Sequence, residues 1–352
     1  MTTVHVVVPE GIDDPARPSG GNAYDRRICR ELARVGWSVR QHAVSGSWPR
    51  PDAASHAALA GVIQGIPDGA LVLLDGLVAS TAPEALVPQA TRLRLVALVH
   101  MPLGHDPADD EARSREGAVL SAAGSVLTTS GWARRTLLEL YALPGERVHV
   151  AEPGVDAAAL AHGTDGAGAL LCVAAVCPGK GHDVLLDALA TLPDQSWQCL
   201  CAGRLDSDRA FVDGLRHRAL DRGLADHVSF SGPLSGADLE RSYRNADLLV
   251  LASRAETYGM VVTEALAHGL PVVATEVGGV PEALGHAADG DRPGLLVPPG
   301  DPAALGAALR AWLGDAALRE RLRRAARERR RSLSGWSTTA SVVSGVLTEA
   351  AA

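Results

Sequence analysis

The sequence predicts an α/β protein with two doubly wound parallel-sheet domains in tandem. Short apolar runs, typical of buried parallel strands, alternate with helical patterns along the chain. The alternation breaks once, at the turn-prone residues 152–156 and the small residues that follow through Gly168, and then restarts. At 352 residues, the chain is long enough for two domains that each have a core of their own.

The first half begins with a buried strand, Val4-His5-Val6-Val7-Val8-Pro9, and a helix is predicted from Ala23. Between them, Gly20 and Gly21 are predicted to lie in a loop whose backbone can approach a ligand closely. A plain flexible loop is the alternative. The further strand candidates are residues 38–44, 70–75, 93–100, 125–129 and 147–151. The further helix candidates are residues 53–66, 82–87, 108–123 and 132–140.

The second half repeats the pattern with a strand over residues 169–176, a loop that contains Lys180, and a helix over residues 182–192. The further strand candidates are residues 197–202, 228–231, 247–252, 271–275 and 294–297. An Arg-rich helix is predicted over residues 303–331, with a solvated face or an interdomain contact, followed by a helix over residues 337–349. We therefore divide the chain into residues 1–155, residues 156–334, and a C-terminal helix, residues 335–352, that packs back on the N-terminal domain.

Composition narrows the class of protein. A hydrophobic content of 47% and a net charge of −8 are typical of a globular protein, and the acidic balance argues against nucleic acid as a partner. No apolar run reaches the length of a membrane span, and the chain enters a strand directly after Met1-Thr2-Thr3, so a cytoplasmic location is expected. The cysteines are Cys29, Cys172, Cys177, Cys199 and Cys201. Their odd number and the absence of a Cys-x-x-Cys pair favour buried thiols over metal ligands.

Lys180 is the only lysine, whereas arginine supplies every other fixed positive charge. A compositional preference for arginine would replace lysine wherever arginine serves as well. The surviving lysine therefore indicates a position that needs a compact ammonium and does not fit a planar guanidinium. A chance survivor on the surface is the alternative.

Two glutamates in residues 253–269 carry the most specific pattern. An apolar strand is followed by a loop with Glu256 and by a short helix with Glu264, which ends before Gly269. Glu256 can accept hydrogen bonds from sugar hydroxyls, and Glu264 can bridge vicinal hydroxyls such as those of a ribose. The amides at the start of the helix suit an anionic ligand; they belong to Gly259, Met260 and Val261. The alternative is a surface loop with two solvated glutamates.

Other polar loops come directly after predicted strands. Parallel sheets bind ligands at the carboxyl ends of their strands, where such loops lie. In the second half they contain Gly203-Arg204, Arg254 and Gly278-Gly279-Val280-Pro281-Glu282. In the first half they contain Gly20-Gly21, Asp75-Gly76 and His100-Met101-Pro102. Two such domains predict a ligand in a cleft between them, where a lysine, a helix N-terminus and glycine loops can bind a diphosphate.

These motifs together resemble family 4 of the retaining glycosyltransferases, which have the GT-B fold. The resemblance rests on residues 253–275, on Gly278-Gly279-x-x-Glu282 and Lys180-Gly181, and more weakly on Gly20-Gly21 and residues 152–156. It spans nearly the whole chain and implies two Rossmann-like domains that face a central cleft. It also implies retaining transfer of a sugar from a nucleoside-diphosphate-sugar to an acceptor hydroxyl.

The resemblance assigns roles to individual residues. Lys180 would neutralise the departing diphosphate, Glu256 would hold the transferred sugar, Glu264 the donor ribose, and the backbone from Gly232 to Leu234 the base. His100 would reach the sugar from the N-terminal domain, unless it is a strand-end histidine satisfied by the backbone. The predicted catalytic residues are Lys180, Glu256 and His100. The predicted substrate-binding residues are Gly20, Gly21, Gly203, Arg204, Gly232, Leu234, Arg254, Thr257, Tyr258, Gly259, Met260, Val261 and Glu264.

The chain departs from the family where an arginine usually helps to bind the diphosphate. The two positions at which relatives carry that arginine hold Ala175 and Gly179, so Arg254 or Arg204 is expected to replace it. Asp206-Ser207-Asp208 resembles the metal motif of another glycosyltransferase fold but is interpreted as a solvated helix start. No metal or other cofactor is expected.

Two other functions fit the same motifs: a nucleotide-sugar epimerase or hydrolase with this fold, and a non-catalytic nucleotide-sugar binding protein. The acceptor would be a small molecule, a lipid or a glycan, chosen by N-terminal loops in which Asn22, Asp75 and His105 are candidates. Weak membrane association occurs in relatives that glycosylate lipids, but no basic amphipathic helix supports it here. No pattern indicates an oligomeric state.

Overall fold

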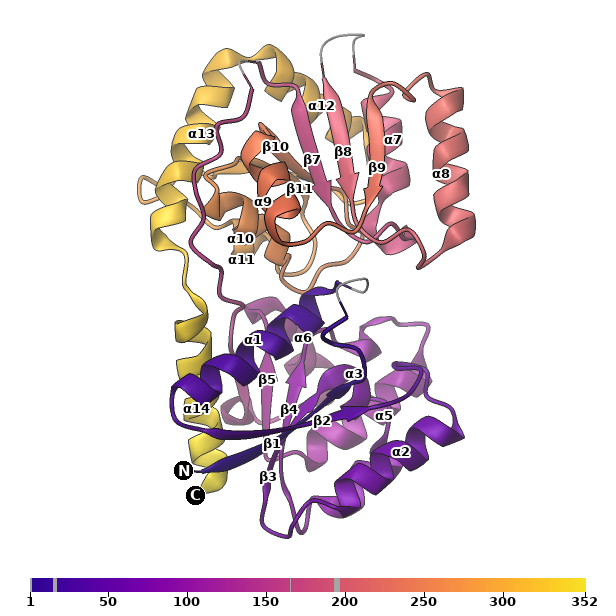
Figure 1. Ribbon diagram of the computed structural model, residues 1–352, viewed down its shortest axis with the longest axis vertical. Helices are drawn as coiled ribbons and strands as arrows, with labels where there is room; N and C mark the ends of the chain where they lie inside the picture. The colour runs from indigo at the N-terminus through magenta and orange to yellow at the C-terminus, as the bar shows by residue number, and fades with distance from the viewer. Residues whose placement is uncertain (1, 15–17, 165, 193–196) are drawn as a thin grey trace. The chain divides into compact units, whose positions relative to one another are not determined.

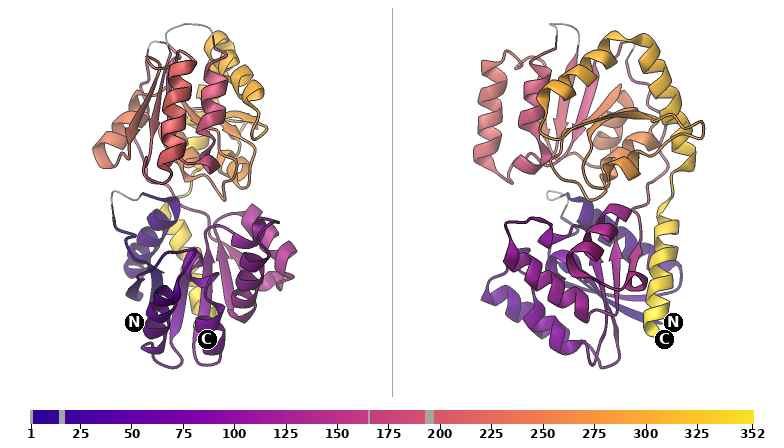
Figure 2. Two further views of the ribbon diagram at one scale, coloured as in Figure 1. Left: turned by 90° about the vertical axis from the view of Figure 1, so that its right-hand side faces the viewer. Right: turned by 180° about the vertical axis from the view of Figure 1, so that it is seen from behind.

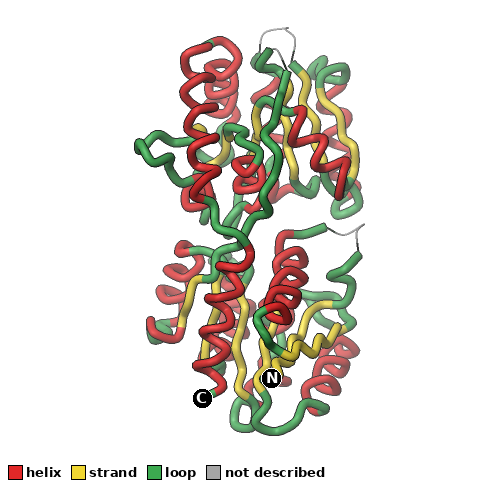
Figure 3. Tube along the Cα trace, turned by 60° about the vertical axis from the view of Figure 1, so that its left-hand side comes forward, coloured by secondary structure: helices red, strands yellow, loops and turns green. Residues whose placement is uncertain are grey.

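The computed structural model describes residues 2–14, 18–164, 166–192 and 197–352 and contains two compact units. The first unit takes in residues up to Asp14, Ser19–Gly154 and Ser334–Ala352, and the second is built on Val155–Leu333. Each unit has a six-stranded parallel sheet, in the order β2-β1-β3-β4-β5-β6 in the first and β12-β11-β10-β7-β8-β9 in the second. Helices and strands alternate along the chain in both units (Figure 3).

The sheet of the first unit is covered by helices, so its inner strands are apolar throughout; all five residues of β3 are buried. The strands are β1 (Thr3–Pro9), β2 (Ser38–Val44), β3 (Leu71–Asp75), β4 (Arg94–Val99), β5 (Ser125–Thr128) and β6 (Val148–Val150). The helices are α1 (Gly20–Arg34), α2 (Ala53–Gln64), α3 (Gly76–Ala79), α4 (Pro83–Leu86), α5 (Asp110–Ala122) and α6 (Gly131–Tyr141). Each strand lies at the position that the apolar runs predict, within a few residues.

Gly20 and Gly21 are the first two residues of α1, so their prediction as a loop was wrong. The helix begins there because the Ser19 side chain accepts a hydrogen bond from the Asn22 amide at 3.1 Å, which caps its N-terminus. A Cβ added to Gly21 would lie 3.3 Å from the ring of His100. The glycine therefore lets the start of α1 pack against this histidine.

The second unit repeats the architecture. Its strands are β7 (Ala169–Val173), β8 (Gln198–Ala202), β9 (Val228–Gly232), β10 (Leu248–Leu251), β11 (Val272–Thr275) and β12 (Gly294–Val297). Its helices are α7 (His182–Leu189), α8 (Arg209–Asp221), α9 (Gly236–Asn245), α10 (Met260–Ala267), α11 (Val280–Leu284), α12 (Pro302–Gly314) and α13 (Ala316–Arg329). Short 3₁₀ turns are η1 (Val87–Gln89), η2 (Leu103–His105), η3 (Gly145–Arg147), η4 (Pro178–Lys180) and η5 (Arg330–Ser332).

Two aspartates mark helix starts in the second unit. Asp208 caps α8 by accepting from the Phe211 amide at 2.9 Å, as the prediction of a helix start requires. Asp315 separates α12 from α13, whereas the sequence predicts one continuous helix over residues 303–331. Its carboxylate accepts from the amides of Ala317 and Leu318, so the chain starts a new helix there.

The C-terminal helix, α14 (Trp336–Ala351), belongs to the first unit and contacts α1 and strands β3, β4 and β5 (Figures 1 and 2). The ring of Trp336 meets that of Tyr24 edge-on, with centroids 5.5 Å apart. Thr339 Oγ1 donates to the carbonyl oxygen of Glu152 at 2.8 Å. In the described part of the chain, none of the helices combines the length and apolar character that a membrane crossing requires.

Candidate functional site

Lys180 lies at the end of a tight turn in the second unit. The turn η4 follows β7 and leads through Gly181, which adopts the left-handed conformation with φ +65°, into α7. A Cβ on Gly181 would overlap the carbonyl oxygen of Ala252, so only glycine fits against the end of β10. The Arg254 amide also donates to the carbonyl oxygen of Gly179 at 2.8 Å. The Lys180 turn is therefore fixed to the loop that carries Glu256.

This fixation brings Lys180 and Glu256 into direct contact, although 76 positions separate them in the sequence. Lys180 Nζ donates to Glu256 Oε1 at 2.6 Å, and Ser253 Oγ donates to the same oxygen at 2.8 Å. The two charged side chains are 30% and 12% exposed. A partly desolvated, charge-assisted hydrogen bond of this kind fixes both heads at the carboxyl end of β10.

The loop after Glu256 leads to the first turn of α10. Gly259 has φ +87° at the N-cap of this helix, and the N-cap makes no side-chain capping hydrogen bond. Such an N-terminus suits an anion. Gly278 packs beneath the loop, because a Cβ there would overlap the carbonyl oxygen of Glu256. Thr257 is half-buried and Tyr258 is buried in the same loop.

Glu264 lies one turn into α10 and receives a hydrogen bond from Tyr243 Oη at 2.7 Å. Burial raises the pKa of the Glu264 carboxyl, and the hydrogen bond from Tyr243 opposes that rise. Burial and the charge of Glu264 also raise the pKa of Tyr243 well above its ordinary value. The sequence did not indicate Tyr243 as part of the site, because it comes from α9.

Both arginines predicted to bind the diphosphate are paired with carboxylates. Arg254 donates to both oxygens of Asp183 on α7, at 2.9 and 2.7 Å, and to the carbonyl oxygen of Pro178 at 2.6 Å. These hydrogen bonds from Arg254 lower the pKa of Asp183. Arg204 Nε donates to Asp206 at 2.9 Å. The structure thus places Arg254 beside the Lys180 turn but gives it a protein partner.

The loops after β8 and β9 approach each other at the same end of this sheet. The amide of Gly203 donates to the carbonyl oxygen of Gly232 at 2.9 Å, and a Cβ on Gly203 would overlap the carbonyl oxygen of Ala174. Gly232 has φ +79° at the end of β9, and Leu234 follows it, half-buried. The predicted base-binding segment therefore ends a strand of the sheet that carries Lys180 and Glu256.

In the first unit, His100 lies directly after β4 between two buried carboxylates. Its Nε2 is 2.9 Å from Asp25 Oδ1 and 3.4 Å from Asp75 Oδ2, and the side chains of both aspartates are 2% exposed. Asp75 also accepts from the amide of Leu77, which caps α3. The second oxygen of Asp25 has no hydrogen-bond partner among the described residues. No sequence pattern indicated Asp25, because it lies inside α1.

These carboxylates hold the imidazole in its charged form. Burial alone would lower the pKa of His100, but the charges and hydrogen bonds of Asp25 and Asp75 raise it to about 10. Burial raises the pKa of Asp25 to about 7, against the opposing influence of His100. Of the other acceptor-side candidates, Asn22 lies in the first turn of α1, and His105 is exposed and meets the ring of Trp132 edge-on.

Comparisons with known proteins relate the chain to glycosyltransferases. Residues 163–329 match the family described as Glycosyl transferases group 1. A D-inositol 3-phosphate glycosyltransferase from Jonesia denitrificans is 36% identical over 253 residues, which cover 65% of this chain and 58% of the relative. The chain thus spans little more than half the length of this curated relative.

Two solved structures share the fold. The sucrose-phosphate synthase from Thermosynechococcus elongatus has a TM-score of 0.79 at 22% identity, with 99% of both chains covered. HepE from Anabaena in complex with UDP-glucose has a TM-score of 0.80 at 19% identity, with 99% of this chain and 100% of that chain covered. The chain therefore has the GT-B fold of glycosyltransferases. Its second unit carries a Glycosyl transferases group 1 domain.

The raised pKa of His100 predicts a pH-dependent stability. Its folded pKa of about 10 lies above the ordinary value of 6.5, so the stabilisation from its pairing is complete below about pH 6.5 and is lost as the pH rises through about 10. Stability to urea should therefore fall over this range, and the fall should be smaller in His100→Gln. The exposed His105, changed to Gln, is the matched control. An equal pH dependence in wild type and His100→Gln would contradict the charged state assigned to His100.

Proposed function

We propose that the protein is a retaining glycosyltransferase that transfers a sugar from a nucleoside-diphosphate-sugar to an acceptor hydroxyl. The observation that carries this proposal is the contact between Lys180 and Glu256 beside the uncapped N-terminus of α10. It combines a cation and free amides, which suit a diphosphate, with a carboxylate, which suits sugar hydroxyls. The GT-B fold and the group 1 domain support the same function.

The chemical task at such a site is to stabilise the negative charge that develops on the departing phosphate. The Lys180 ammonium and the amides at the start of α10 supply positive charge for that purpose. Both hydrogen bonds that Glu256 accepts from described side chains end on Oε1, which leaves Oε2 for a hydroxyl of the transferred sugar. Tyr243 orients Glu264 for the donor ribose.

In this proposal, the acceptor hydroxyl attacks the same face of the sugar from which the diphosphate leaves. The anomeric configuration of the sugar is therefore retained. The departing phosphate accepts the proton of the acceptor hydroxyl, so transfer needs no pair of carboxylates of the glycosidase kind. We also propose that transfer needs no metal, because Lys180 and the helix amides offset the phosphate charge. The contact of His100 with the sugar stays a prediction from the family resemblance.

The comparisons suggest the first substrates to test. The Anabaena structure contains UDP-glucose, and the relative from Jonesia is named for D-inositol 3-phosphate. A UDP-hexose and a phosphorylated polyol are therefore the first donor and acceptor classes for a screen. The donor and acceptor of this chain are proposals, because the chain spans only part of that relative.

The test is a mass-spectrometric assay of the full chain with UDP-, GDP- and ADP-sugars, with and without inositol 3-phosphate and other polyols. We expect an acceptor-dependent glycoside whose anomeric configuration, read by NMR, is that of the donor. Lys180→Ala and Glu256→Gln should each reduce transfer by about 10²-fold or more. Glu328→Gln, a change of a glutamate on the surface of α13, is the control.

Four results would contradict parts of this proposal. Full activity of Lys180→Ala would remove the role of the lysine in stabilising the leaving group. Donor turnover at the same rate without acceptor would favour an epimerase or hydrolase. Donor binding without any turnover would favour a binding protein. Loss of transfer in EDTA that magnesium or manganese restores would contradict metal independence.

Arg254 provides a separate prediction. If its guanidinium binds the donor diphosphate, Arg254→Ala should weaken donor binding several-fold, whereas Asp183→Asn should preserve or strengthen it by releasing the arginine. If Arg254 instead acts only by bracing the Lys180 turn through Asp183, both variants should weaken donor binding alike. Titration calorimetry with the donor distinguishes these results. Unchanged donor affinity in Arg254→Ala would exclude both roles.

A further inference from the structure

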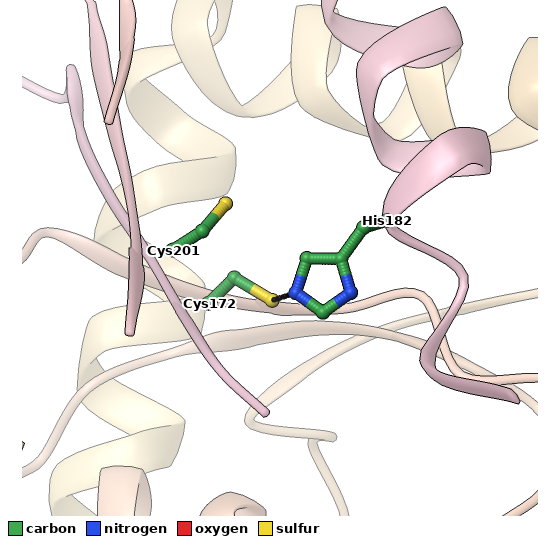
Figure 4. A group of neighbouring side chains, drawn as sticks. All are labelled: Cys172, His182 and Cys201. Atoms are coloured by element: carbon green, nitrogen blue, oxygen red, sulfur yellow. Dashed lines mark hydrogen bonds between the residues drawn. The ribbon is translucent and has the colours of Figure 1, made fainter. Parts of the chain in front are cut away.

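Two cysteines and a histidine form a buried cluster in the core of the second unit. Cys172 on β7 and Cys201 on β8 are register partners in the parallel sheet, and His182 is the first residue of α7. Each of the three residues is 1% exposed. Figure 4 shows a ring nitrogen of His182 facing the sulfur of Cys172, with Cys201 beside it. Three residues from three elements thus present soft donor atoms to one small volume.

The spacing of the donor atoms is close to that of a metal site. Cys172 Sγ and His182 Nε2 are 3.7 Å apart, and one donor atom from each of the three residues lies within 4.8 Å of the others. With Zn–S bonds of about 2.3 Å and Zn–N bonds of about 2.0 Å, tetrahedral ligands lie roughly 3.5 Å from one another. Small side-chain movements would therefore bring all three atoms onto one ion.

The imidazole of His182 is poorly satisfied without such an ion. Its Nδ1 has no hydrogen-bond partner among the described residues, and its Nε2 faces a thiol, which is a weak partner. Buried polar groups normally have good partners. A metal bond would give Nε2 a strong partner in place of the thiol.

Two thiols lie side by side in this cluster, because Cys172 and Cys201 are register partners on adjacent strands. A dipositive ion would offset the charges of two thiolates, which a buried site otherwise cannot hold. Cys199 lies two residues before Cys201 on β8, so its side chain points to the same face of the sheet.

We propose that Cys172, Cys201 and His182 bind a thiophilic closed-shell cation of the Zn²⁺ class in the core of the second unit. Thiolate and imidazole ligands are the set that such ions prefer. The site does not rest on the proposed transfer reaction, because its three ligands lie outside the contact between Lys180 and Glu256. Since His182 opens α7 two residues after Lys180, a bound ion would fix the start of this helix to the sheet and stabilise the fold.

The test uses the full chain with Cys29→Ala and Cys177→Ala, which removes the two less buried thiols. The reduced, metal-free protein is titrated with Co²⁺, and thiolate-to-metal absorption is recorded, followed by competition with Zn²⁺. We expect one ion per chain, displacement of Co²⁺ by Zn²⁺, and a higher melting temperature with Zn²⁺. Adding Cys172→Ala, Cys201→Ala or His182→Ala should weaken binding at least about tenfold.

Absence of thiolate-to-metal absorption in the folded parent protein would overturn the proposal, as would absorption that survives Cys172→Ala. A second measurement covers variants that fail to fold. The unsubstituted chain is alkylated with and without Zn²⁺ during brief denaturant pulses, and the modified cysteines are identified by mass spectrometry. Selective protection of Cys172 and Cys201 by Zn²⁺ supports the site, and equal alkylation with and without Zn²⁺ contradicts it.

Discussion

The ion pair between Lys180 and Glu256 depends on close backbone packing of three loops. Gly181 fits against the Ala252 carbonyl and Gly278 against the Glu256 carbonyl, and any side chain at either position would separate the loops. The charged pair is partly shielded from water, so its desolvation cost offsets much of its attraction. The ion pair therefore serves more to hold a cation and a carboxylate at a set position beside α10 than to stabilise the fold.

The first unit holds charge in a different way. Asp25 on α1 and Asp75 at the end of β3 are both buried, and they raise the pKa of His100, which directly follows β4. A histidine with a pKa of about 10 does not act as a general base near neutral pH. The raised pKa favours a cationic hydrogen-bond donor, which agrees with a proposed reaction in which the departing phosphate takes the proton.

The sequence predicted the parallel strands well, because apolar runs bounded by turns are the direct signature of strands covered on both faces. The prediction of helix boundaries failed where a single capping side chain starts a helix against the sequence pattern. Ser19 starts α1 at a glycine pair, and Asp315 divides an Arg- and Ala-rich stretch that reads as one helix. Lys180, Glu256 and Glu264 could be placed near strand ends because they lie in short motifs there, and their roles stay predictions.

The partners of those residues were not predictable from spacing. Tyr243, Asp183 and Asp25 come from helices, and only the packing of each unit brings them to Glu264, Arg254 and His100. The same holds for the buried thiols. Cys172 and Cys201 are far apart in the sequence and show no metal-binding spacing, yet the register of β7 and β8 makes them neighbours.

The proposed function requires that Lys180 binds the diphosphate of a nucleotide donor. Titration calorimetry of the full chain with UDP, GDP, ADP and the matching nucleosides tests it most directly. One diphosphate should bind the wild type at least about tenfold more tightly than Lys180→Ala, since removing one partner of a charged contact costs about 1.4 kcal/mol or more. The matching nucleoside, which lacks phosphates, should bind both proteins equally. Equal affinity of wild type and Lys180→Ala for every diphosphate would exclude this role of Lys180.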